Sequence, residues 1–190
     1  MRLGVLVSGR GSNLRNLVER GFAVVAVATN RPSCGAAAYA REQGLPLGEF
    51  SQKAHASAEA RDAAMRDWLS SLEVELVVNA GYDRILSSAF VGAFESRLLN
   101  VHPSLLPAFG GGMDAVERAL AHGVKLTGCT VHLVTDEVDA GPILLQAAVP
   151  VLAGDSVDSL RARIQAEERR ILPDAIEMLT RSLAARPSLR

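Results

Sequence analysis

Short apolar runs alternate with helix-forming stretches along the first hundred residues of this chain, and this alternation constrains the fold most. Four runs lack the polar alternation of a half-exposed strand: Leu3–Val7, Phe22–Ala28, Leu76–Asn79 and Leu98–Val101. Such runs are typical of parallel strands covered on both faces. The stretches between them have helical character: Ser12–Arg20, Gly35–Gln43 and Ser57–Leu72. The sequence therefore predicts an α/β fold, an open and mostly parallel sheet with helices on both faces.

The second half of the chain changes character. Two strand-like runs, Thr127–Thr135 and Pro142–Val151, bracket a short turn, so we expect an antiparallel or mixed extension of the sheet here. Residues Ser156–Ser182 follow with apolar positions on one face and predict a long helix. Pro173 lies inside this stretch, and proline should kink or split the helix there.

Length and composition narrow the class of protein. The chain has 190 residues, 48% hydrophobic and 22% charged, which is typical of one folded domain, here residues 1–185, with a frayed tail at 186–190. A formal net charge of -1 argues against a protein that clamps nucleic acid. The N-terminal apolar run is too short for a signal peptide or a membrane helix. Cys34 and Cys129 form neither a disulfide framework nor a metal knuckle, so we expect a cytoplasmic protein.

A glycine-containing turn, Ser8–Asn13, follows the first strand and opens the first helix. Ligands of open α/β sheets bind beyond the carboxyl ends of the strands, and the free N–H groups of a helix N-terminus attract anions. The turn therefore predicts a phosphate site at Gly11, Ser12 and Asn13. Its pattern is neither GxGxxG nor a Walker loop. The alternative is that Ser12 or Asn13 only caps the helix and the glycines only make the turn.

Asn100 and His102 stand at the end of a buried strand. Because they are two positions apart, their side chains project to the same face of an extended strand. An amide that stabilises an oxyanion, beside an imidazole that moves a proton, would suit a reaction at a carbonyl group. The alternative is a satisfied polar pair at a strand end.

Asp139 lies in the turn between the two later strands. A carboxylate next to a histidine raises the histidine pKa by stabilising the imidazolium, which would suit a proton shuttle. Sequence alone does not place Asp139 beside His102, and the alternative is that Asp139 only forms the turn. We expect His132 on a strand and not on a metal, because its spacing from Cys129 sends the two side chains to opposite faces. No cluster of residues has metal-ligand spacing, so we predict no metal.

Five segments, in order and at these separations, carry a resemblance to a known family: SGRGSNL (8–14), GYDRILSSAF (81–90), NVHPSLLPAF (100–109), TGCTVHLVTDEVDAGPILLQ (127–146) and VPVLAGDS (149–156). Together they resemble the phosphoribosylglycinamide formyltransferase family of purine synthesis, over nearly the whole chain. HPSLLP with a later DxGP also occurs in methionyl-tRNA formyltransferase and formyltetrahydrofolate deformylase, so SGRGSNL is the discriminating segment. Those two enzymes usually carry a further domain, for which we expect no room in 190 residues.

The resemblance implies a Rossmann-like formyltransferase fold and a reaction. The formyl group of 10-formyltetrahydrofolate passes to the amino group of glycinamide ribonucleotide, without a metal. The residues that match the family's functional positions fall into three groups. The catalytic group is Asn100, His102 and Asp139; the ribonucleotide group is Gly11, Ser12, Asn13 and, at the glycinamide end, Glu168; the folate group is Asp83, Arg84, Ile85 and Leu86, with Asn100.

Three positions depart from the family pattern. Asp83 replaces a residue that is usually apolar, so the edge of the folate pocket should differ. Gly110–Gly112 replaces the usual Pro-Gly, which should make this loop more flexible. Ala58 stands where many members carry a basic residue that reaches the folate's glutamate tail, and Arg61, about one helical turn later, is the candidate substitute.

Other functions remain open at this point. A binding protein that lost catalysis would not need Asn100, His102 and Asp139. A formyltransferase that acts on another amine, such as a sugar nucleotide, or a deformylase that uses water are the alternatives among enzymes. A water-using enzyme would not need the phosphate site in SGRGSNL. We expect small-molecule substrates, no nucleic acid or membrane as partner, and a monomer or homodimer.

Overall fold

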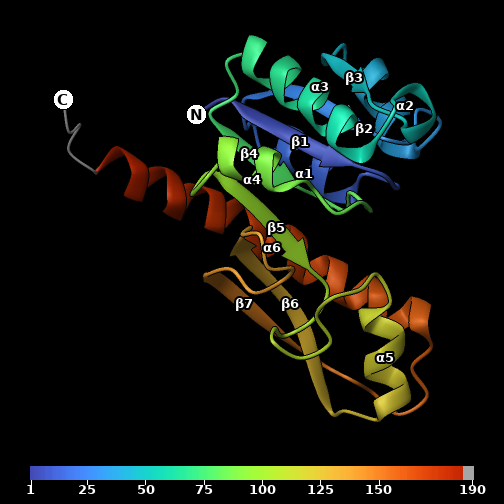
Figure 1. Cartoon of the computed structure of the whole chain (residues 1–190). Helices are drawn as coiled ribbons and strands as arrows, with labels where there is room; N and C mark the ends of the chain where they lie inside the picture. The colour runs from blue at the N-terminus through green and yellow to red at the C-terminus, as the bar shows by residue number, and fades with distance from the viewer. Residues whose placement is uncertain (186–190) are drawn as a thin grey trace.

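The computed structural model describes residues 1–185, so the expected tail at 186–190 lies outside the described residues. Its strands form one sheet in the order β3-β2-β1-β4-β5-β6-β7 (Figure 1). Their bounds are β1 Leu3–Val7, β2 Val24–Thr29, β3 Leu47–Glu49, β4 Leu76–Asn79, β5 Leu98–His102, β6 Leu126–Leu133 and β7 Ile143–Pro150. Strands β1 to β5 are parallel, and β6 and β7 extend the sheet antiparallel. The predicted sheet and its antiparallel extension are therefore confirmed.

Helices connect the strands. They are α1 Ser12–Glu19, α2 Gly35–Glu42, α3 Ala58–Ser71, α4 Ser88–Ala93, α5 Ala115–His122 and α6 Val157–Ala184, with a 3₁₀ turn at Gln52–Ala54. The sequence patterns predicted α1, α2, α3 and α6 within a few residues of these bounds. The elements β3, α4 and α5 were not predicted; β3 and α4 have only three and six residues, which give too little periodicity to recognise.

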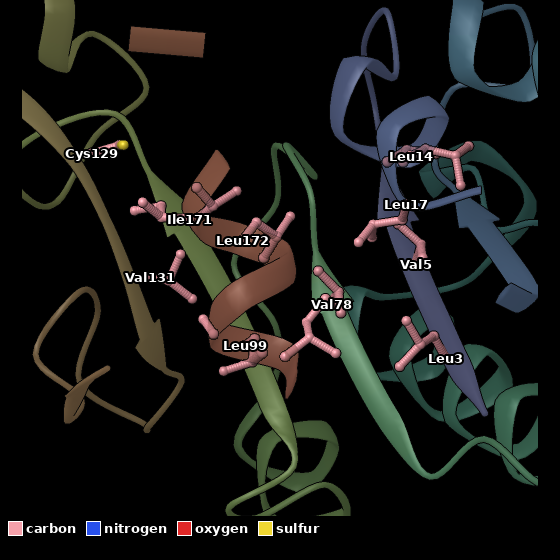
Figure 2. Close-up of a cluster of buried hydrophobic side chains, with 14 of the residues drawn as sticks. Leu3, Val5, Leu14, Leu17, Val78, Leu99, Cys129, Val131, Ile171 and Leu172 are labelled. Carbon is pink, nitrogen blue, oxygen red and sulfur yellow. The ribbon is translucent and has the colours of Figure 1, made fainter. Parts of the chain in front are cut away.

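The sheet is covered on both faces. On β1 the side chains alternate: Val5 points into a core with α1, α2, α5 and α6, and Leu6 points into a second core with α3 and α4. Figure 1 shows α3 and α4 together on one side of the strands. In Figure 2, Ile171 and Leu172 of α6 lie over β5, near Leu99. This double coverage explains why the strands read as continuous apolar runs.

Pro173 does not split α6, which was one of the two outcomes expected of it; a kink at this position stays a prediction. The helix is continuous from Val157 to Ala184 with a buried Pro173 inside it. A proline removes the N–H that would bond to the carbonyl four residues earlier, here that of Arg169. The Asn16 side chain of α1 donates to this carbonyl instead, with Nδ2 at 2.8 Å from the oxygen. A contact between helices therefore replaces the missing hydrogen bond.

Strand order creates a crevice at one edge of the sheet. The chain leaves β1 toward β2 on one side, whereas β4 leads to β5 on the other, so β1 and β4 are neighbours at a switch point. Ligands of open α/β sheets bind at such a point, beyond the carboxyl ends of the strands. The predicted functional residues follow these strand ends.

Candidate active site

A pocket of about 540 Å³ lies at the carboxyl ends of β1, β4 and β5. It brings together every residue that the sequence predicted for the site, from segments that are far apart in the chain. These residues are Gly11, Ser12, Asn13, Asp83, Arg84, Ile85, Leu86, Asn100, His102, Asp139 and Glu168. The shared pocket supports reading them as one site.

Asn100, His102 and Asp139 meet in this pocket. Asp139 Oδ2 lies 3.4 Å from His102 Nδ1, and Asp139 Oδ1 lies 3.5 Å from Asn100 Nδ2. Both strand residues thus face the same side, as their spacing predicted. These contacts contradict the alternative that Asp139 only forms a turn. They also contradict the alternative that Asn100 and His102 are merely a polar pair at a strand end, because both contact Asp139.

His132 belongs to the same cluster, although the sequence argument assigned it only to a strand. Antiparallel pairing of β5 with β6 sets His132 directly opposite Asn100. Its Nδ1 lies 2.9 Å from the Leu133 carbonyl, so Nδ1 carries the proton and Nε2 accepts from Asn100 Nδ2 at 3.0 Å. Asp139 Oδ1 is 3.7 Å from the same Nε2. Spacing along one strand shows which residues share a face, but it does not show which residue of the next strand lies opposite. The role of His132 could therefore be found only from the register between β5 and β6.

Burial governs the protonation of His102. The side chain is 6% exposed, and this desolvation lowers the pKa of His102 below its ordinary value, although Asp139 and the Phe109 carbonyl, 3.2 Å from Nε2, act to raise it. We expected a net rise caused by Asp139, and the net direction was wrong because burial outweighs the carboxylate. The pKa of Asp139 is lowered, first by the neighbouring His132 imidazole and also by the hydrogen bond from the Gly111 amide. The cluster therefore favours a neutral histidine beside a carboxylate.

The loop from Val134 to Gly141 is shaped to present Asp139. Asp139 has φ 56°, in the left-handed region that aspartate tolerates better than most residues. The Gly111 amide donates to Asp139 Oδ2 at 2.8 Å. At Gly141, a Cβ would lie 1.8 Å from the Leu133 carbonyl oxygen, so only glycine permits this close approach of β6. The glycine of the DxGP motif, Gly141, is thus required for steric reasons.

The first turn of α1 lines the pocket without a side-chain cap. Gly11 is the N-cap residue, so neither Ser12 nor Asn13 caps the helix as the alternative proposed. Gly11 has φ 81°, and a Cβ there would lie 2.7 Å from that of Ala36 in α2. Glycine is therefore required by packing as well as by backbone conformation. The free amides of this turn can bind an anion.

Glu168 of α6 reaches the same end of the pocket. Asn13 Nδ2 donates to Glu168 Oε2 at 3.1 Å, and burial raises the pKa of the Glu168 carboxyl. Asn13 Oδ1 is buried without a partner among the described residues. An unpartnered buried oxygen is costly, so a ligand that donates a hydrogen bond would be favoured here.

The sequence pattern of the formyl transferase family matches residues 1–176. The chain belongs to this family. The formyl transferase is 46% identical over 183 residues to a phosphoribosylglycinamide formyltransferase of Mycobacterium tuberculosis, covering 94% of this chain and 84% of that one. It is 39% identical over 184 residues to a trifunctional purine biosynthetic protein of Bos taurus, covering 94% of this chain but spanning only 18% of that relative's length.

A solved structure agrees with this family. The crystal structure of glycinamide ribonucleotide transformylase 1 from Symbiobacterium toebii has a TM-score of 0.89 and 47% sequence identity, covering 93% of this chain and 85% of that one. The Rossmann-like formyltransferase fold expected for the formyl transferase is thus confirmed.

Asp83 lies at the edge of the pocket and contacts residues that follow two of the strands. It pairs with Arg31 and accepts a hydrogen bond from Asn30 Nδ2 at 2.7 Å. Its own amide donates to Ser8 Oγ at 3.0 Å. In this formyl transferase, Asp83 therefore binds the ends of β1 and β2 as well as lining the pocket. Ile85, two residues later, is 76% exposed at the pocket.

Arg61 cannot serve as the substitute beside Ala58 that the sequence suggested. Its side chain is 2% exposed and pairs with Asp62, so it cannot reach a glutamate tail in solvent. The expected substitution was wrong because the neighbouring Asp62 holds the guanidinium inside the protein, which spacing along the helix does not reveal. The increased flexibility expected of Gly110–Gly112 stays a prediction.

Residues 1–185 contain no group of three or more His, Cys, Asp or Glu arranged to hold a metal ion. Among the same residues, every helix is too short or too polar to cross a membrane. The prediction of a reaction without metal stays a prediction.

Proposed function

We propose that this formyl transferase is a phosphoribosylglycinamide formyltransferase. It transfers the formyl group of 10-formyltetrahydrofolate to the amino group of glycinamide ribonucleotide and so contributes to purine synthesis. The observation that carries the proposal is one pocket that joins the uncapped start of α1 to the cluster of Asn100, His102 and Asp139. A phosphate at α1 would direct the amino end of the ribonucleotide along the pocket toward the formyl group.

Bond formation begins when the substrate amine attacks the formyl carbon. The carbonyl oxygen becomes an oxyanion, and Asn100 Nδ2 donates a hydrogen bond to it. The hydrogen of Asn100 that points to Asp139 makes only a 3.5 Å contact, so it is available for the oxyanion, while the other stays on His132. Such a donor contributes about 10²–10³-fold in rate.

Proton transfer follows from the neutral state of His102. A neutral imidazole accepts the proton that the attacking amine must lose. Asp139, 3.4 Å from Nδ1, stabilises the resulting imidazolium. His102 then donates the proton to the folate nitrogen as its bond to the formyl carbon breaks. The proton count balances, because tetrahydrofolate leaves with the proton that the amine gave up.

The two ends of the pocket divide the substrates. The amides of Gly11–Asn13 bind the phosphate, and Glu168 binds the glycinamide end. Residues Asp83–Leu86, with Asn100, line the folate side. We also propose a cytoplasmic enzyme, without metal, nucleic acid or membrane as partner, that acts as a monomer or homodimer.

Purified protein mixed with both substrates tests the proposal. We expect tetrahydrofolate to form, measured by absorbance, in equal amount to formylated ribonucleotide, measured by mass spectrometry. Release of free formate without the ribonucleotide would indicate a deformylase instead. Turnover only with an amino sugar nucleotide would change the acceptor, and binding of both ligands without turnover would indicate a protein that lost catalysis.

A further inference from the structure

The segment from Ala80 to Ser87 joins β4 to α4 without regular structure and carries the folate group of residues; we name it the folate loop. The end nearest β4 is held by strand ends. The Ser8 amide donates to the Gly81 carbonyl at 3.1 Å, and the Tyr82 amide donates to Asn79 Oδ1 at 2.8 Å. The backbone of this first half is therefore fixed by β1 and β4.

Two neighbouring residues of α3 hold the second half of the folate loop. Arg61 Nη2 donates to the Ile85 carbonyl at 3.4 Å, and the Ser87 amide donates to Asp62 Oδ2 at 2.7 Å. Ile85 itself is 76% exposed, so packing of its side chain does little to fix this part of the loop. The hydrogen bonds from α3 fix the backbone of this part of the loop instead.

Arg61 and Asp62 form a fully buried ion pair. Arg61 is 2% exposed and Asp62 is 0% exposed, and two guanidinium nitrogens lie 2.8 and 2.7 Å from Asp62 Oδ1. The third nitrogen donates to Gln52 Oε1 at 3.0 Å. Burial of two charges is costly, and an apolar pair of similar volume is often equally stable or more so. A gain in folding stability therefore does not explain why a buried ion pair is present at this position.

We propose that Arg61 and Asp62 are positioning residues for folate binding. The pair holds the Ile85 carbonyl and the Ser87 amide, so that Arg84, Ile85 and Leu86 present one preformed surface to the apolar ring system of the folate. Preformed surfaces bind more tightly because less ordering is needed on binding. This inference rests on the proposed function, and Arg61 acts through the folate loop without touching the reacting atoms.

A matched control lies just over one turn further along the same helix. Arg66 and Asp67 are also sequence neighbours, with Arg66 Nε 2.8 Å from Asp67 Oδ1, but this pair lies at the surface and does not line the pocket. We compare Arg61→Lys with Arg66→Lys. Lysine keeps the charge, but its single ammonium cannot replace the three-sided contacts of the guanidinium.

Steady-state kinetics and hydrogen exchange test the proposal. In Arg61→Lys we expect KM for 10-formyltetrahydrofolate to rise about tenfold, the size of one charge-assisted hydrogen bond, with kcat and KM for the ribonucleotide within about twofold. The Ser87 amide should exchange faster in the free protein. Arg66→Lys should change none of these. An unchanged folate KM, or equal changes in both KM values, would overturn the proposal.

A second variant covers failure to fold. The double change Arg61→Leu with Asp62→Asn leaves no buried charge unpaired and removes the donor to Ile85, while the amide side chain introduced by Asp62→Asn can still accept from Ser87. It should show the same rise in folate KM, and a wild-type folate KM would overturn the proposal. If the wild-type protein itself showed no formyl transfer, the proposed function would be refuted and not the role of the ion pair. In that case, hydrogen exchange of the Ser87 amide still tests whether Arg61 and Asp62 hold the folate loop. An exchange rate in Arg61→Lys equal to that of wild type would refute this part of the proposal.

Discussion

His102 is the residue on which the proposed chemistry depends most. Changing His102 to Ala removes the group that moves the proton, so kcat should fall at least about 100-fold, while both KM values change little. His122→Ala, at an exposed histidine of α5, is the control and should leave kcat unchanged. If His102→Ala kept more than about a tenth of the wild-type kcat, the assignment of His102 would be wrong.

The pKa of His102 can be measured directly. In the folded protein it should lie below the ordinary histidine value of about 6.5, because burial disfavours the imidazolium. Asp139 acts to raise it, so the pKa should fall further in Asp139→Asn. Stability follows the same sign: His102 contributes stability above about pH 6.5 that is lost as pH falls through its folded pKa. NMR titration of the His102 ring checks this, and a higher pKa in Asp139→Asn would contradict it.

At the scale of elements, α6 depends on α1 at Pro173. Asn16→Ala leaves the Arg169 carbonyl without a donor and should lower the free energy of unfolding by about 1 kcal/mol. In a Pro173→Ala background, the restored backbone amide at this position can donate to that carbonyl, so the same change should matter less. A double-mutant cycle by urea denaturation measures the difference. Additive effects of the two changes would show that the side chain does not replace the missing bond.

The start of α1 gives the test of the phosphate site. Asn13→Asp places a negative charge in the first turn, where it would repel a bound phosphate. KM for the ribonucleotide should therefore rise at least about tenfold, and KM for folate should stay near wild type. Gly11→Val is a poorer test, because its side chain would collide with Ala36 and disturb α2 as well. Phosphate soaked into a crystal should bind the amides of residues 11–13. Phosphate found against Arg84 instead would reverse the two substrate sites.

Sequence patterns predicted those features that depend on neighbours in the chain. Period-two spacing placed Asn100 and His102 on one face, and a strand-turn-helix pattern placed Gly11 at the pocket. The role of His132 was missed, because it depends on the register between β5 and β6.

Tertiary contacts also overrode local rules. Pro173 was expected to kink or split α6, but the helix is not split, and Asn16 supplies a hydrogen bond to the Arg169 carbonyl from 153 residues away in the sequence. Arg61 was the candidate to reach the glutamate tail of the folate, but its partner Asp62 and the folate loop bury it. A long-range partner can thus reverse what the local sequence predicts for a proline or a charge.

For the whole molecule, we predict that formyl transfer needs no metal. The oxygens of Asp139 already contact His102, His132 and the Gly111 amide, which leaves the carboxylate little capacity to bind a cation. Activity should therefore be unchanged after EDTA treatment and dialysis. Loss of activity that zinc or magnesium restores would refute this prediction.

We also expect the contacts of α1 with α6 to decide when the chain can first bind its substrate during synthesis. Asn13 meets Glu168, and Asn16 meets the Arg169 carbonyl, across separations of 155 and 153 residues. Contacts between such distant residues form late, because the intervening chain must be ordered first. While α6 is still missing from a nascent chain, the proposed phosphate site at the start of α1 should lack its contacts with Glu168 and Arg169. Nascent chains should bind the ribonucleotide only after α6 has emerged.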